Sequence, residues 1–202
     1  MCSPPACCDG RTAKDSMSSI STKLTFALGS DEKSRKLPSK IVVSQSQNET
    51  LDHVMLKALA FVIFHSDRLR MEVDLELPGV AFVPDLVAVG LDGRPELWVE
   101  CGEVSLHKLK KLTLKLNDCD IWVVKRTAGE VAKTLELARR EIKRLGRLRL
   151  LTFDPGFLPE VLANARGANS IHLVKLVPGE LMQLVFNDLW FETALHVTAA
   201  PP

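Results

Sequence analysis

Two acidic residues lie in segments that otherwise resemble buried strands. Asp85 follows Pro84 inside an apolar run, and Glu100 follows Leu97-Trp-Val. Burial of an ionised carboxylate is costly unless a cation or strong hydrogen-bond donors meet it. Mg²⁺ and Mn²⁺ favour carboxylate oxygens, so the two acids are candidate metal ligands. The alternative is that one of them faces solvent or pairs with an arginine such as Arg70.

The turn between the two segments places the acids near each other. Asp92-Gly93 separates the apolar runs 80–91 and 95–101, and Asp-Gly is a strong hairpin signal. Counting seven residues back and seven forward from this turn pairs Asp85 with Glu100. Cross-strand neighbours lie about 5 Å apart, so two carboxylates there would repel each other without a bridging cation.

A basic helix is expected directly after Glu100, over residues 105–116. Its apolar face consists of Leu109, Leu112 and Leu116, and its basic residues are Lys108, Lys110, Lys111 and Lys115. Ser105 is a suitable N-cap, which places the start of the helix near the end of the Glu100 strand. One lysine can then reach a metal-bound phosphate. The alternative is a lysine face that is simply solvated.

Four further residues are accessory candidates. Glu49 and Asp52 lie at the start of a helix expected over 49–65, where they are possible outer or second-metal ligands. Ser46-x-x-Glu49 also forms a capping box, and this structural role is favoured for Glu49. Glu103 is a possible metal ligand and His107 a possible phosphate contact or base, although both residue types are more often solvated at such positions.

The element pattern that must position these residues predicts an α/β fold, with a central mixed sheet flanked by helices. Helices are expected over 49–65, 105–116, 128–145 and 158–165. Strands are expected over 23–28, 40–45, 71–77, 80–91, 95–101, 120–125, 147–153, 171–177, 181–186 and 190–197. The alternating segment 71–77 is expected to be an edge strand. Residues 22–198 are expected to form one domain, and residues 1–21 a disordered or artefactual leader.

Composition restricts the class of protein. The chain has 202 residues and a formal net charge of +1, so any site for a polyanion must be a local basic patch. The five cysteines match neither a disulfide framework nor a zinc motif. No apolar run is long enough for a signal peptide or a membrane span, which predicts a cytoplasmic protein without a membrane partner. Nucleotide-binding, serine-hydrolase and zinc-protease motifs are absent.

The chain resembles the YaeQ family, a branch of the PD-(D/E)XK nuclease-like superfamily. The resemblance rests on the order and spacing of 49–61, Pro84-Asp85-Leu, 97–102 and Leu109-Lys110-Lys111, with agreement at 151–154 and 179–192. It implies a restriction-endonuclease-like core in which Asp85 and Glu100 bind the metal. Gly102 occupies the position where the superfamily pattern has a lysine, and Lys111 corresponds to the lysine that replaces it in this branch.

The activity implied by the resemblance is hydrolysis of nucleic-acid phosphodiester bonds, dependent on Mg²⁺ or Mn²⁺. Asp85, Glu100 and Lys111 would be the catalytic residues. Lys108, Lys110 and Lys115 would contact the nucleic acid. The alternative function, which Gly102 supports, is a catalytically inactive nuclease-like fold that binds nucleic acid or a protein partner as a regulatory module.

Overall fold

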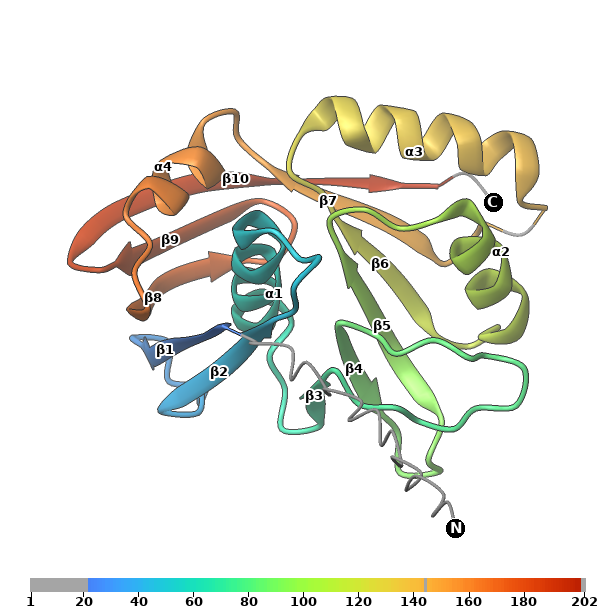
Figure 1. Cartoon of the computed structure of the whole chain (residues 1–202), viewed down its shortest axis with the longest axis horizontal. Coiled ribbons are helices and arrows are strands. Elements are labelled where there is room, and N and C mark those ends of the chain that lie inside the picture. The colour runs from blue at the N-terminus through green and yellow to red at the C-terminus, as the bar shows by residue number, and fades with distance from the viewer. Residues whose placement is uncertain (1–21, 144, 201–202) are drawn as a thin grey trace, which may run out of the picture.

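All strands of the computed structural model belong to one mixed sheet, shown in Figure 1. The structure describes residues 22–143 and 145–200, and the leader expected at 1–21 lies outside the described residues. The strand order is β2-β1-β8-β9-β10-β7-β6-β5-β4-β3. Parallel pairing occurs between β1 and β8 and along β5-β6-β7, and the other neighbours are antiparallel. The predicted α/β fold, with helices flanking a central mixed sheet, is confirmed.

The elements have the following bounds. The strands are β1 Thr22–Ser30, β2 Lys40–Gln45, β3 Leu69–Met71, β4 Leu86–Val89, β5 Pro95–Cys101, β6 Asp120–Val124, β7 Leu148–Phe153, β8 Ala168–Val177, β9 Leu181–Phe186 and β10 Leu189–Ala199. The helices are α1 Leu51–Phe64, α2 Leu106–Lys115, α3 Ala128–Glu141 and α4 Phe157–Ala163.

Helix α1 lies in the hollow of the curved sheet (Figure 1). Every residue from Val54 to Ile63 is buried. The helix packs in one apolar cluster with side chains from both halves of the sheet, among them Phe26, Leu184 and Val99. This helix is apolar nearly all round because the sheet and α4 cover it, as expected for a helix at the centre of a core.

Helices α2 and α3 cover the opposite face of the sheet, over β5, β6 and β7 (Figure 1). Their buried apolar residues are Leu109 and Leu112 of α2 and Val131, Leu135 and Ala138 of α3. They pack on a second apolar cluster that contains Trp98, Ile121 and Leu150. These strands are therefore covered on both faces, which explains their dense apolar sequences.

The prediction of a strand over residues 71–77 is wrong. The edge strand β3 ends at Met71, and Glu72 and Glu76 have backbone φ angles of 52° and 49°. Such left-handed residues interrupt a strand ladder. The alternating residues Leu75 and Leu77 instead pack against the apolar cluster under α2 as part of an irregular segment. Strand 80–91 is also shorter than expected, since β4 begins at Leu86.

The predicted register of the β4–β5 hairpin is confirmed. Leu86 pairs with Val99 across the antiparallel ladder, so Asp85 and Glu100 are the next residues outward on the two segments. A register shift between Ala88 and Val89 lies on the turn side of this pair and does not change it. The hairpin is therefore the element that brings the two acids together.

Replacement of Leu59 tests the enclosure of α1. Leu59 is fully buried, so Leu59→Ala should lower the free energy of unfolding by about 2–5 kcal/mol through lost burial and a new cavity. Leu114→Ala is the control, because Leu114 is 56% exposed and its loss should change stability by less than about 0.5 kcal/mol. Urea denaturation measures both. Equal effects of the two substitutions would contradict an enclosed α1.

Candidate active site

Asp85 is fixed by donors from two other elements. Its Oδ2 accepts a hydrogen bond from the backbone N–H of Cys101 at 2.6 Å. Its Oδ1 lies 3.2 Å from Nε2 of His53 on α1. The backbone N–H of Glu72 also donates to the carbonyl oxygen of Asp85 at 3.1 Å. The carboxylate is therefore held between the end of β5 and the start of α1.

Glu100 is a buried acid with two donors. The indole N–H of Trp98 donates to Oε1 at 2.6 Å, and the ammonium of Lys108 lies 2.7 Å from the carboxylate. Burial raises the pKa of Glu100 to about 7; the Lys108 charge opposes this rise, and the nearby Asp85 charge adds to it. The two acids are therefore close enough to interact electrostatically, as the hairpin count predicted.

A line of polar side chains begins just before α1, continues on the helix and reaches Asp85. Glu49, His53 and Lys57 follow one another at intervals of four residues. The Lys57 ammonium is 1% exposed and lies 2.5 Å from carboxylate oxygens of both Glu49 and Glu72. Burial opposes the charge on Lys57, but these two acids raise the pKa of its ammonium above the ordinary lysine value.

His53 connects this line to Asp85. Its Nε2 lies 3.6 Å from Glu49 and 3.2 Å from Asp85. Burial lowers the pKa of His53, but Asp85 and Glu49 outweigh that effect and raise it above the ordinary histidine value. Sequence reasoning missed His53 and Lys57 as site residues, although their spacing from Glu49 in a strongly apolar helix was a usable signal.

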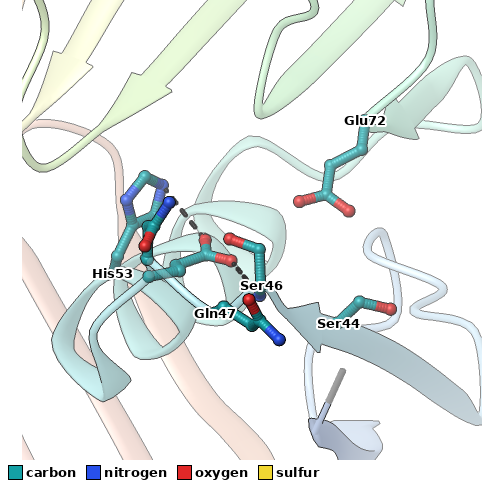
Figure 2. Close-up of a pocket in the computed structure, with 7 residues that line it drawn as sticks. Ser44, Ser46, Gln47, His53 and Glu72 are labelled. Carbon is teal, nitrogen blue, oxygen red and sulfur yellow. Dashed lines mark hydrogen bonds and ion pairs between the residues drawn. The ribbon is translucent and has the colours of Figure 1, made fainter. Parts of the chain in front are cut away.

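Two pockets adjoin His53. Figure 2 shows the larger one, of about 540 Å³, with His53 and Glu72 on opposite sides. Its lining is Ser44, Ser46, Gln47, Asn48, Glu49, His53 and Glu72. A second pocket of about 250 Å³ shares Asn48, Glu49 and His53 and extends toward Gly102 and Arg126. Glu49 and His53 thus form the boundary between two polar hollows beside Asp85.

Asp52 and Glu103 gather around Arg126, away from the acid pair. The guanidinium of Arg126 lies 3.6 Å from Asp52 and 4.0 Å from Glu103, with Glu130 closer at 2.6 Å. Glu103 has a side chain that is 93% exposed. Both acids line the smaller pocket, and among the described residues neither forms a salt bridge that would connect it to Asp85 or Glu100. Their expected role as accessory metal ligands stays a prediction.

Lys108 is the lysine of α2 that contacts the acid pair. Its ammonium also donates to the carbonyl oxygen of Val83 at 3.1 Å. The ammonium of Lys111 lies over the Phe82 ring, 5.9 Å from its centroid, and the His107 ring packs edge-on against the same ring. Lys110 and Lys115 are exposed. The catalytic role expected of Lys111 stays a prediction, and Lys108 is better placed for it.

Glu49 makes one hydrogen bond of the capping box expected at Ser46-x-x-Glu49, but this contact lies in the turn before the helix and does not cap it. The backbone N–H of Ser46 donates to Glu49 Oε2 at 3.1 Å. The helix itself begins later than expected, because Thr50 is the N-cap and accepts from the backbone N–H of His53. Glu49 therefore lies outside the helix, and its other carboxylate oxygen meets Lys57.

Gly102 forms the turn directly after β5, two residues beyond Glu100. Its φ angle is +64°, a backbone conformation that residues other than glycine rarely adopt. Its N–H donates to the carbonyl oxygen of Val124, and its own carbonyl oxygen accepts from Lys125 Nζ, both at 2.8 Å. Burial lowers the pKa of Lys125. The turn after β5 is thus fastened to the end of β6 at two points.

Residues 22–143 and 145–200 contain neither a larger cluster of metal-binding side chains nor a membrane-spanning helix. No cluster of three or more His, Cys, Asp or Glu side chains able to hold a metal ion occurs in these ranges. Within the same ranges, no helix is both long and apolar enough to span a membrane.

Replacement of Glu100 tests its raised pKa. Between pH about 4.5 and about 7, folded Glu100 keeps a proton that the unfolded chain loses, so this group's stabilisation is complete below that range and is lost as pH rises through it. Glu100→Gln removes the effect. The unfolding free energy of the unaltered protein, minus that of the variant, should fall by about 3 kcal/mol from pH about 4 to about 8. Denaturation in EDTA measures this difference, and a pH-independent value would contradict the raised pKa.

Replacement of Lys57 tests the buried ion pairs of α1. Lys57→Met leaves Glu49 and Glu72 without their shared cation and should lower the free energy of unfolding by about 3–5 kcal/mol. Lys110→Met, at an exposed position of α2, is the matched control and should cost less than about 0.5 kcal/mol. Chemical denaturation at neutral pH distinguishes the two. A Lys57 variant as stable as the control would show that the pairs are dispensable.

Comparisons with known proteins identify the family. The chain is similar in fold to the YaeQ protein from Xanthomonas axonopodis pv. citri, with a TM-score of 0.68, 18% identity and coverage of 90% of this chain and 99% of that one. It is likewise similar to the YaeQ protein from Pseudomonas syringae, with a TM-score of 0.67, 13% identity and coverage of 91% and 97%. The search of curated proteins returned no match. A family model described as YaeQ protein matches residues 18–182, and the chain therefore belongs to the YaeQ family.

Proposed function

We propose that this protein is a nuclease that hydrolyses nucleic-acid phosphodiester bonds with Mg²⁺ or Mn²⁺ bound to Asp85 and Glu100. The observation that supports it best is that the β4–β5 hairpin makes these acids cross-strand neighbours, one residue outward from the Leu86–Val99 pair. The Lys108 ammonium lies 2.7 Å from Glu100. An acid just before β4, an acid on β5 and a lysine on the following helix are the groups that the proposed restriction-endonuclease-like PD-(D/E)XK core would use.

The acid pair suits a hard divalent cation in its donor chemistry. Mg²⁺ is commonly bound by one or two carboxylates, several waters and the substrate phosphate, so a third acidic ligand is not required. The buried Glu100 carries the destabilising effect of both desolvation and the Asp85 charge. A bound cation would relieve both. The residues present therefore fit such an ion.

The chain's own residues have distinct tasks in this proposal. Trp98 and the Cys101 N–H orient Glu100 and Asp85, as outer-shell hydrogen bonds orient metal ligands in general. The bound ion would supply a water of lowered pKa and neutralise phosphate charge. Lys108 would place a positive charge where negative charge develops on the phosphate. His53 keeps Asp85 in position from the side of α1.

Helix α2 is the proposed nucleic-acid surface. Lys110, Lys111 and Lys115 are exposed on the helix whose first turn carries Lys108. The pockets beside His53, in contrast, contain the carboxylates of Glu49 and Glu72, which would repel phosphate. The backbone should therefore approach along α2, and binding should weaken as salt rises because lysine–phosphate contacts release counterions.

A specific observation also favours the second candidate, a nuclease-like fold that binds nucleic acid or a protein without cleaving it. Each acid already has protein donors: His53 and Cys101 for Asp85, and Trp98 and Lys108 for Glu100. The pair is thus a satisfied structural unit without a metal ion. Such a unit would stabilise the hairpin in a purely binding module.

A cleavage assay distinguishes the two candidates. Protein with Mn²⁺ or Mg²⁺ should degrade DNA or RNA, and EDTA should stop it. Asp85→Asn and Glu100→Gln should each reduce the rate at least about a hundredfold by weakening the charge stabilisation of the reacting phosphate. Glu136→Gln, at a 62% exposed side chain on α3, is the control and should leave the rate unchanged.

The opposite pattern would support the binding module. Folded protein that retains salt-dependent nucleic-acid binding but cleaves neither DNA nor RNA with either metal is incompatible with the nuclease proposal. Loss of binding in Lys110→Ala plus Lys115→Ala would then assign the binding to α2.

A further inference from the structure

Glu100 depends on a single cation. Its side chain is 6% exposed, and Lys108 is the only basic side chain within 4 Å of its carboxylate among the described residues. A buried carboxylate left without a counter-ion is strongly destabilising. Some positive charge must therefore remain at Glu100 whenever this acid is ionised.

Lys108 has fewer charged partners than Lys57, the buried lysine that lies beside Glu49 and Glu72. Lys57 is 1% exposed and lies between two carboxylates. Lys108 is 19% exposed, meets one carboxylate, and uses a neutral carbonyl oxygen as its second partner. Its ammonium also lies 5.6 Å from the centroid of the Phe82 ring. This cation–π contact is weak, so it does not hold the side chain in one position.

The Lys108 ammonium can move away from Glu100 without a change in the backbone. The residue belongs to the first turn of α2, which the Ser105 side chain caps by accepting from the Lys108 N–H at 3.1 Å. Apolar contacts of Leu109 and Leu112 anchor the helix. Only the flexible four-carbon side chain has to move. The Trp98 N–H stays on Oε1 and keeps the carboxylate oriented.

A divalent cation and the Lys108 ammonium cannot share the same approach to Glu100. Mg²⁺ binds carboxylate oxygen at about 2.0–2.1 Å, which would bring it into close like-charge contact with an ammonium about 2.7 Å from the same group. Repulsion at such a distance is large in a partly buried site. One cation must replace the other.

We propose that Lys108 is an exchangeable counter-ion of Glu100, which a divalent cation displaces and thereby frees to contact a phosphate. This inference rests on the proposed function, because it concerns the same two acids. It assigns Lys108 two successive positions: on Glu100 without metal, and toward the substrate with metal. Lys108 then competes with the metal ion for Glu100 and, once displaced, contacts the same phosphate as the bound ion.

Calorimetric titration of Mn²⁺ into the full chain, in low-salt buffer at pH about 8, tests the exchange. Lys108→Met removes the competing charge, so its Mn²⁺ affinity should exceed that of the unaltered protein by about tenfold or more, the equivalent of one charged hydrogen bond. Lys133→Met, at an exposed position of α3 outside the proposed site, is the control, and its affinity should stay within about twofold. Circular dichroism checks that each variant is folded.

Lys108→Gln is the second variant in case Lys108→Met does not fold without metal. Glutamine retains a hydrogen-bond donor toward Glu100 but carries no charge, so the same rise in affinity is expected. Mn²⁺ affinity equal to or weaker than that of the unaltered protein in the folded Lys108 variants would overturn the exchange, whether or not the protein cleaves nucleic acid.

Two further outcomes separate the exchange from the nuclease proposal. Tighter Mn²⁺ binding by a Lys108 variant than by the unaltered protein, with no cleavage of DNA or RNA by the unaltered protein, would support the exchange and contradict the nuclease proposal. Absence of Mn²⁺ binding in every folded variant would overturn both.

Discussion

The enclosure of α1 by the sheet is the constraint on which the rest of the structure depends. A helix buried over ten successive residues has no water available for a charged side chain, so Lys57 must find its partners within the protein. Glu49 supplies one from the segment before the helix, and Glu72 supplies the other from the segment after β3. Packing of the core thus determines the position of both segments, and the segment from Glu72 leads directly to Asp85.

The acids and bases at this end of the hairpin form one continuous network. Glu72, Lys57, Glu49, His53 and Asp85 follow one another through contacts of 3.6 Å or less. The Cys101 N–H then connects Asp85 to β5, and Glu100 with Lys108 lies beside it. Acidic and basic side chains alternate along this line, so each acid has a hydrogen-bond or ion-pair partner beside it. A change at one member therefore alters the electrostatic environment of the others.

Local signals in the sequence were sufficient for much of this arrangement. The Asp92-Gly93 turn fixed the hairpin register, and the apolar spacing with Ser105 located α2, so the meeting of Asp85 and Glu100 was predictable. The contact of Glu100 with Lys108 instead of Lys111 was not predictable, because it depends on how closely α2 packs against Phe82 and Glu100. The irregular path after Met71 was missed for a similar reason: a long-range ion pair to Lys57 and a left-handed Glu72 override the local alternation.

The left-handed turn at Gly102 disfavours a lysine at that position. A residue other than glycine at φ +64° is strained by about 1–2 kcal/mol, and the carbonyl oxygen there already accepts a hydrogen bond from Lys125. A chain with this turn would more readily carry a positive charge on a neighbouring helix, whereas a chain with an extended backbone would be free to keep it on the strand. Main-chain conformation, rather than the identity of one residue, would then decide where a basic group can arise during divergence.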